Sequence, residues 1–142
     1  HWGTDVDVYD RAAVPADYAV QLVPEEYGPD GPFANLTAWL DAHMHRWGFY
    51  RPYATFRGGV QPEPWPLSHA PTAREAMRRI RASTLARAIE TGAVAGGDAL
   101  LKKLPVVYAR YVRAVDPPPR EAAPRERAAR GGRGARRGPA RR

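Results

Sequence analysis

The sequence contains no cysteine, so disulfide bonds and metal sites built from thiolates are excluded. No run of apolar residues is long enough to span a bilayer. The first residues also lack the basic, apolar and small-residue regions of a signal peptide. Neither absence assigns a compartment. The chain begins inside a motif, so any targeting segment would precede residue 1.

Most of the chain lacks excess positive charge, which is concentrated at one end. The net charge is +7, and residues 117–142 contain nine Arg but only two Glu. The other 116 residues contain 13 Lys or Arg and 13 Asp or Glu, and are neutral. Because the basic segment is also rich in Pro, Gly and Ala, we predict a disordered tail over residues 116–142. It is either a polyanion-binding tail or a solvated extension without a specific partner.

The stretch from Gly58 to Pro71 combines possible hydrolytic chemistry with a constrained backbone. Its four prolines exclude a helix and favour an extended chain, in which residues two apart share a face. One face then presents an acid, an aromatic ring, an apolar residue and an imidazole: Glu63, Trp65, Leu67 and His69. A base beside a metal-ligating nitrogen suits a hydrolytic zinc site. The alternative is a proline-stiffened loop with an exposed Glu and a partly buried His.

Two blocks together show a family resemblance. The chain opens His-Trp-Gly-Thr-Asp-Val-Asp-Val, and residues 58–65 read Gly-Gly-Val-Gln-Pro-Glu-Pro-Trp. These resemble, in order, the signature blocks of zinc D-alanyl-D-alanine carboxypeptidases of the VanY type. Residues 47–53 (Trp-Gly-Phe-Tyr-Arg-Pro-Tyr) resemble the linking block of that family, and residues 101–112 its closing helix. The resemblance covers about residues 1–115.

The resemblance implies particular site residues. The first block of the family reads Ser-x-His-x-x-Gly-x-(Ala or Asp)-x-Asp, which places Asp7 at a zinc-ligand position and the ligand His just before residue 1. Glu63 matches the general base. The third ligand belongs at position 66, which is Pro66 here and cannot bind a metal. We expect His69 to replace it, with His1 as a further candidate and Asp5 orienting a ligand. The alternative is a former site that no longer holds zinc tightly.

The resemblance also implies substrate and location. Such enzymes hydrolyse the terminal amide of peptidoglycan stem peptides ending in D-Ala-D-Ala, at the cell envelope or outside the cell. We expect Trp65 and Arg57 to contact substrate, with Arg51 as another possible contact, because the usual arginine of the family lies upstream of its first block. A monomer is expected. Two other functions stay open: a non-catalytic remnant or cell-wall binding module, and a polyanion-binding protein acting through the tail.

The predicted fold is α+β, a small antiparallel sheet with helices packed on it, as in metallopeptidases of this type. Residues 1–115 form the domain, without the N-terminal portion of the family, and residues 116–142 form the tail. The patterns predict strands at residues 3–9 and 49–56. Helices are predicted at residues 33–47 with a Gly48 cap, at 72–81, from a Ser83 cap to Gly92, and from an Asp98 cap onward with Pro105 dividing or kinking it.

Overall fold

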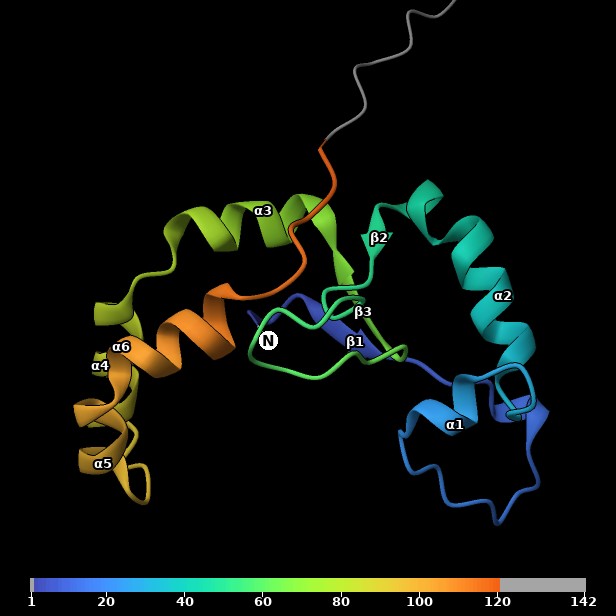
Figure 1. Ribbon diagram of the computed structural model, residues 1–142, viewed down its shortest axis with the longest axis horizontal. Helices are drawn as coiled ribbons and strands as arrows, with labels where there is room; N and C mark the ends of the chain where they lie inside the picture. The colour runs from blue at the N-terminus through green and yellow to red at the C-terminus, as the bar shows by residue number, and fades with distance from the viewer. Residues whose placement is uncertain (1, 121–142) are drawn as a thin grey trace, which may run out of the picture.

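The computed structural model describes residues 2–120 and confirms the α+β class. A three-stranded antiparallel sheet, of order β1-β3-β2, lies at the centre of the molecule (Figure 1). The helices α1 (Pro24–Tyr27) and α2 (Ala34–His43) lie on one side of the sheet, and α4 (Ala82–Thr91), α5 (Gly97–Lys102) and α6 (Leu104–Val107) lie on the other. The predicted tail falls almost wholly outside the described residues.

Strand β3 (Pro66–His69) is central and pairs with both neighbours. Strand β1 (Asp5–Asp7) runs antiparallel to it with Asp7 opposite Pro66, and β2 (Phe49–Tyr50) pairs along its other edge with Phe49 opposite His69. The ladder continues one residue beyond β1, where Val8 N–H donates to the Trp65 carbonyl at 3.2 Å. Pro66 has no N–H, and it occupies the first position of the strand, where proline is tolerated.

The predicted helix at residues 33–47 is confirmed in position but changes type along its length. The α-helix α2 ends at His43, and a 3-10 turn, η2 (Met44–Trp47), completes it. Gly48 follows with φ 76°, a left-handed conformation that glycine adopts without strain. The predicted glycine cap is therefore confirmed.

Three other boundary predictions met different outcomes. The strand predicted to reach residue 56 is wrong beyond Tyr50, because fully buried Pro52 has no N–H for a ladder. The Ser83 cap is also wrong: α4 begins at Ala82, and its cap residue, Arg81, makes no side-chain cap hydrogen bond. The division at Pro105 is confirmed, since α5 ends at Lys102 and α6 begins afresh with the proline in its first turn. A π-helix, η3 (Tyr108–Arg113), continues α6.

A cluster of aromatic rings packs around Phe33 beside α1 and α2. Phe33 is fully buried, and its ring packs against the rings of Tyr9, Tyr18 and Tyr27 at centroid distances of 6.0, 6.4 and 5.1 Å. Tyr27 also packs against Trp65 at 5.7 Å. This aromatic cluster therefore links α1 to the strand that follows Glu63.

A buried carboxylate organises the loop before α1. Glu26 accepts hydrogen bonds from the Tyr18 hydroxyl (2.9 Å), Gln21 N–H (3.0 Å) and Val23 N–H (3.3 Å). Burial opposes ionisation, but these hydrogen bonds outweigh it and lower the pKa of Glu26. Ionised Glu26 thus satisfies donors of a loop that has no regular structure of its own.

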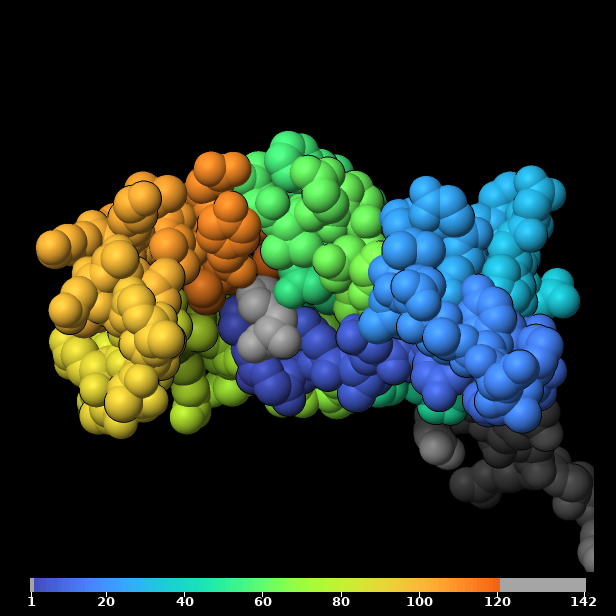
Figure 2. Space-filling model, turned by 90° about the horizontal axis from the view of Figure 1, so that it is seen from below, coloured from blue at the N-terminus to red at the C-terminus, as the bar shows by residue number. Residues whose placement is uncertain are grey.

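The C-terminal helices brace the segment that leads to Glu63. Arg110 on η3 donates from Nε to the Gly58 carbonyl at 2.7 Å. A Cβ atom at Gly59 would meet the Arg110 carbonyl oxygen at 1.8 Å, so only glycine allows this approach. Figure 2 shows the N-terminal residues (dark blue) along the middle of the molecule, below these C-terminal helices (orange) and the segment of residues 50–65 (green).

Candidate functional site

Asp7 and Glu63 converge on one region of the fold. The β1–β3 ladder places Asp7 opposite Pro66, only three residues after Glu63. Glu63 is held by its own N–H, which donates to the Tyr53 carbonyl at 2.9 Å. Burial, and after it the negative charge of Asp7, raises the pKa of Glu63. The two carboxylates that the sequence selected are therefore electrostatic neighbours.

Two tyrosines share this region. Burial raises the pKa of Tyr27 to about 12, with smaller contributions from the charges of Glu26 and Asp7. Burial also raises the pKa of Tyr53, and the charges of Asp5 and Glu63 add to it. Both phenols hence stay neutral at physiological pH, and the Tyr27 hydroxyl donates to the Val8 carbonyl at 2.8 Å. The carboxylates lie among neutral hydroxyl groups.

The structure does not bring His69 to this region. Asp7 is opposite Pro66, and His69 lies three residues further along β3, so its side chain points to the other face of the sheet. Its Nδ1 hydrogen-bonds with Thr72 Oγ1 at 2.8 Å, and its ring packs against Phe49. The role of His69 as a metal ligand stays a prediction, and this placement gives it no support.

The expected substrate-binding residues have other partners in the fold. Trp65 is half-buried against Tyr27. Arg57 pairs with Asp116 at 2.6 Å, and Asp116 also accepts from Thr55 N–H at 2.7 Å. Arg57 therefore helps to fasten the end of the domain to the loop before Gly58. Its role toward a substrate stays a prediction.

A pocket of about 330 Å³ lies beside Glu63, and Arg51 lies in its wall. Arg51 Nε donates to the Pro64 carbonyl at 2.9 Å, and Nη1 pairs with Asp41. Its Nη2 is buried without a hydrogen-bond partner among the described residues. The sequence offers Arg51 and Arg57 as possible substrate contacts, and the position of Arg51 in the wall of the Glu63 pocket distinguishes the two.

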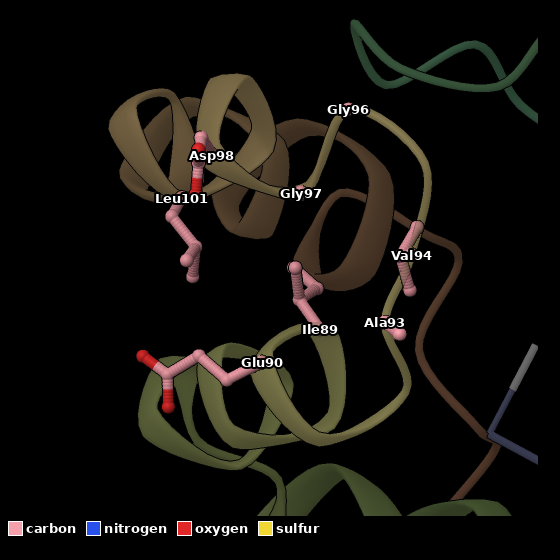
Figure 3. Close-up of a pocket in the computed structure, with 8 residues that line it drawn as sticks. All are labelled: Ile89, Glu90, Ala93, Val94, Gly96, Gly97, Asp98 and Leu101. Carbon is pink, nitrogen blue, oxygen red and sulfur yellow. The ribbon is translucent and has the colours of Figure 1, made fainter.

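A cavity larger than this pocket lies elsewhere in the described chain. It measures about 450 Å³ and lies between α4 and α5, where Ile89 and Leu101 contribute apolar side chains and Glu90 and Asp98 contribute carboxylates (Figure 3). None of the residues that the sequence selected as site residues lines it. Size alone therefore does not identify the functional site of this protein.

The zinc expected from the resemblance needs more donors than residues 2–120 bring together. No group of three or more His, Cys, Asp or Glu in that part of the chain is arranged to hold a metal ion. Position 66 shows why: it lies opposite Asp7 on the same face of the sheet but is occupied by a buried proline. The described residues thus do not fit a complete zinc site.

The charge of Asp7 predicts a measurable effect on Glu63. Replacing Asp7 with Asn removes one of the two causes that raise the pKa of Glu63, so this pKa should fall toward the ordinary value of a glutamate. The Glu63 carboxyl would then ionise at lower pH. NMR titration of the metal-free protein measures this directly, with exposed Asp17→Asn as the control. An unchanged Glu63 pKa in the Asp7 variant would mean that the two carboxylates are not neighbours.

Comparison with known proteins agrees with this geometry. The family model for VanY, D-alanyl-D-alanine carboxypeptidase, matches residues 1–72, just over half of the chain. An uncharacterized protein of Haemophilus influenzae is 30% identical over 114 residues, which cover 79% of this chain and 87% of that protein. No solved structure matches the chain. Because the matched residues include both signature blocks, the chain belongs to the VanY family of D-alanyl-D-alanine carboxypeptidases.

Proposed function

We propose that the protein hydrolyses the terminal D-alanyl-D-alanine amide of peptidoglycan stem peptides, with Glu63 as the general base. The observation that carries the proposal is the proximity of Asp7 to Glu63: the β1–β3 ladder pairs Asp7 with Pro66, three residues after Glu63, and the charge of Asp7 raises the pKa of Glu63. Family membership supplies the reaction class and the cell-wall substrate. A cell-wall substrate places the protein at the envelope or outside the cell. None of the helices in residues 2–120 could cross a membrane.

Glu63 is suited to the base role by its surroundings. It lies in the wall of a pocket, and its raised pKa makes the ionised carboxylate a stronger base than an exposed glutamate. Water attacks the amide carbonyl carbon and gives a proton to Glu63, which passes it to the leaving amine as the C–N bond breaks. When the pH falls below the raised pKa of Glu63, the carboxylate is protonated and no longer accepts a proton from water. The activity is therefore lost at acid pH.

Arg51 is placed to hold the substrate in this proposal. A carboxypeptidase must bind the free carboxylate of the terminal residue that it releases. Arg51 shares the pocket with Glu63, is only 12% exposed and has an unpaired Nη2. Its partner Asp41 is 57% exposed and so holds the guanidinium weakly. We therefore assign the carboxylate contact to Arg51 in preference to Arg57, which lies outside this pocket.

Asp7 is the one described residue that this proposal assigns as a zinc ligand. Asp7 matches the metal-ligand aspartate of the family, and residues 2–120 contain no group of three His, Cys, Asp or Glu that could hold a metal ion. This shortage favours a second candidate function, a cell-wall binding module that keeps the fold and has lost tight zinc binding. The specific observation is the proline at position 66, opposite Asp7.

Replacing Glu63 with Gln tests the base. We expect release of D-alanine from acetyl-L-Lys-D-Ala-D-Ala to fall by a factor on the order of 100 or more, since general-base catalysis contributes about that much. The zinc content of both proteins, measured by mass spectrometry, should be recorded with the rates. Exposed Glu25→Gln is the matched control. Wild-type protein that binds the peptide without releasing D-alanine would instead establish the binding module.

Replacing Arg51 with Gln tests the carboxylate contact. We expect the KM for the peptide to rise by about tenfold, as for loss of a charge-assisted hydrogen bond, with a smaller change in kcat. The variant should also lose discrimination between the peptide and its C-terminal amide. Arg57→Gln should leave both properties unchanged. If the Arg51 variant discriminates between the peptide and its amide as well as the wild type does, Arg51 does not bind the carboxylate and only supports the segment around Pro64.

Replacing Pro66 with His tests the missing donor. A cross-strand partner of Asp7 on the same face has its Cβ about 4.5–5.5 Å away, within reach of a shared metal. We expect zinc to bind the variant more tightly than the wild type, as measured by competition with a chromogenic chelator. Pro15→His, in an exposed loop, is the control. Equal zinc affinity in all three proteins would contradict a metal position between Asp7 and residue 66.

A further inference from the structure

A second pocket lies at the end of the sheet away from Asp7. It measures about 430 Å³ and is formed by the turn from η2 into β2, the start of α3 (Ala70–Arg79) and residues 119 and 120. Its charged or titratable lining consists of three arginines and a histidine: Arg46, Arg74, Arg120 and His45. No acidic residue lines it. Arg46 and Arg74 come from residues 1–116, which are neutral overall, whereas Arg120 belongs to the basic C-terminal segment.

The positive charges of this arginine pocket are not compensated within the described chain. The ion pairs of residues 2–120 join Arg51 to Asp41, Arg57 to Asp116, and both Arg78 and Arg79 to Glu75. Glu75 follows Arg74 in the sequence but is engaged by the arginines one turn further along α3. The first turn of α3 adds the partial positive charge of a helix N-terminus. Together these groups attract an anion.

The wall of the pocket is held in place by two hydrogen bonds to backbone carbonyls. Ala70 N–H donates to the Gly48 carbonyl at 2.7 Å, which fixes the start of α3 against the turn before β2. Arg74 Nη1 donates to the Pro119 carbonyl, which holds the last described residues over α3. Arg46 makes no hydrogen bond or ion pair within the described residues and is exposed at the rim. It is therefore available to a ligand.

We propose that the arginine pocket binds phosphate groups of a linear polyanion. Guanidinium groups match phosphate oxygens in a fork geometry, and three of them around one cavity suit successive phosphates better than one small anion. Residues 121–142, directly after Arg120, carry eight further arginines. A fixed pocket followed by a basic segment gives multivalent attachment to one polymer. This proposal does not depend on the hydrolytic function.

The test uses the full chain and inorganic polyphosphate of uniform length. Arg46→Gln should weaken binding about 2–5-fold, as expected for an exposed ion pair, and Arg46→Gln with Arg74→Gln should weaken it further. The slope of log affinity against log salt should fall by about 0.7 for each phosphate group that the variant no longer neutralises. Exposed Arg87→Gln on α4 is the matched control, because it removes the same charge outside the pocket. NMR shifts induced by tripolyphosphate should include the amides of Gly48 and Ala70.

Several outcomes would overturn the proposal. If Arg46→Gln and Arg87→Gln weaken binding equally, the attraction is a property of net charge and the pocket has no special role. If polyglutamate of equal charge binds with the same dependence on Arg46, the pocket is not selective for phosphate. Single-stranded DNA of equal charge is the third ligand to be compared. Dependence on Arg46 with both DNA and polyphosphate supports recognition of the phosphate chain itself, and dependence with DNA alone contradicts it.

Discussion

The antiparallel pairing of β1 with β3 is the constraint on which the site depends. Three residue pairs, from Asp5 opposite Ser68 to Asp7 opposite Pro66, join two segments that are about sixty residues apart in the sequence. The pairing also decides which side chains share a face. A slip of one residue would turn Asp7 to the face on which His69 lies and away from Glu63. The chemistry of the site therefore follows from the register of a very short ladder.

Such a short ladder needs support from the rest of the chain. The segment around Glu63 and Pro64 is held by two hydrogen bonds: Glu63 N–H donates to the Tyr53 carbonyl, and the Arg51 side chain donates to the Pro64 carbonyl. In addition, η3 approaches Gly59 so closely that no side chain fits between them. The family match ends at residue 72, yet the helices beyond it brace the loop that carries the proposed base. The second half of the chain is thus part of the scaffold of the site.

The two proposed functions use opposite ends of one strand. At the Pro66 end of β3, a pocket is lined by the Glu63 carboxylate, the neutral Tyr53 hydroxyl and Arg51, whose side chain is 12% exposed. At the His69 end, the turn after η2 and the start of α3 gather arginines without acidic partners. The two pockets share no lining residue, so a phosphate chain held at the arginine pocket leaves the pocket beside Glu63 open to a peptide. Attachment and hydrolysis are compatible on this architecture.

Local sequence patterns determined the parts of the structure that depend on neighbouring residues. The helix at residues 33–47 with its Gly48 cap and the division of the last helix at Pro105 follow from side-chain periodicity and backbone freedom. The Ser83 cap was wrong because α4 begins one residue earlier, at Ala82, so Ser83 lies inside the helix. The motif blocks also selected Asp7 and Glu63, which the fold brings near each other although the chain between them is long.

Only the tertiary structure decided what depends on register and on distant partners. The sequence placed Glu63, Trp65, Leu67 and His69 on one face, but the strand starts at Pro66, so alternation does not extend back to Glu63. Arg51 and Arg57 look equivalent in the sequence, yet one lines the pocket of Glu63 and the other pairs with Asp116. The gathering of Arg46, Arg74 and Arg120 was equally invisible. Charge and burial of a side chain are set by residues far away in the chain, and a linear pattern does not contain that information.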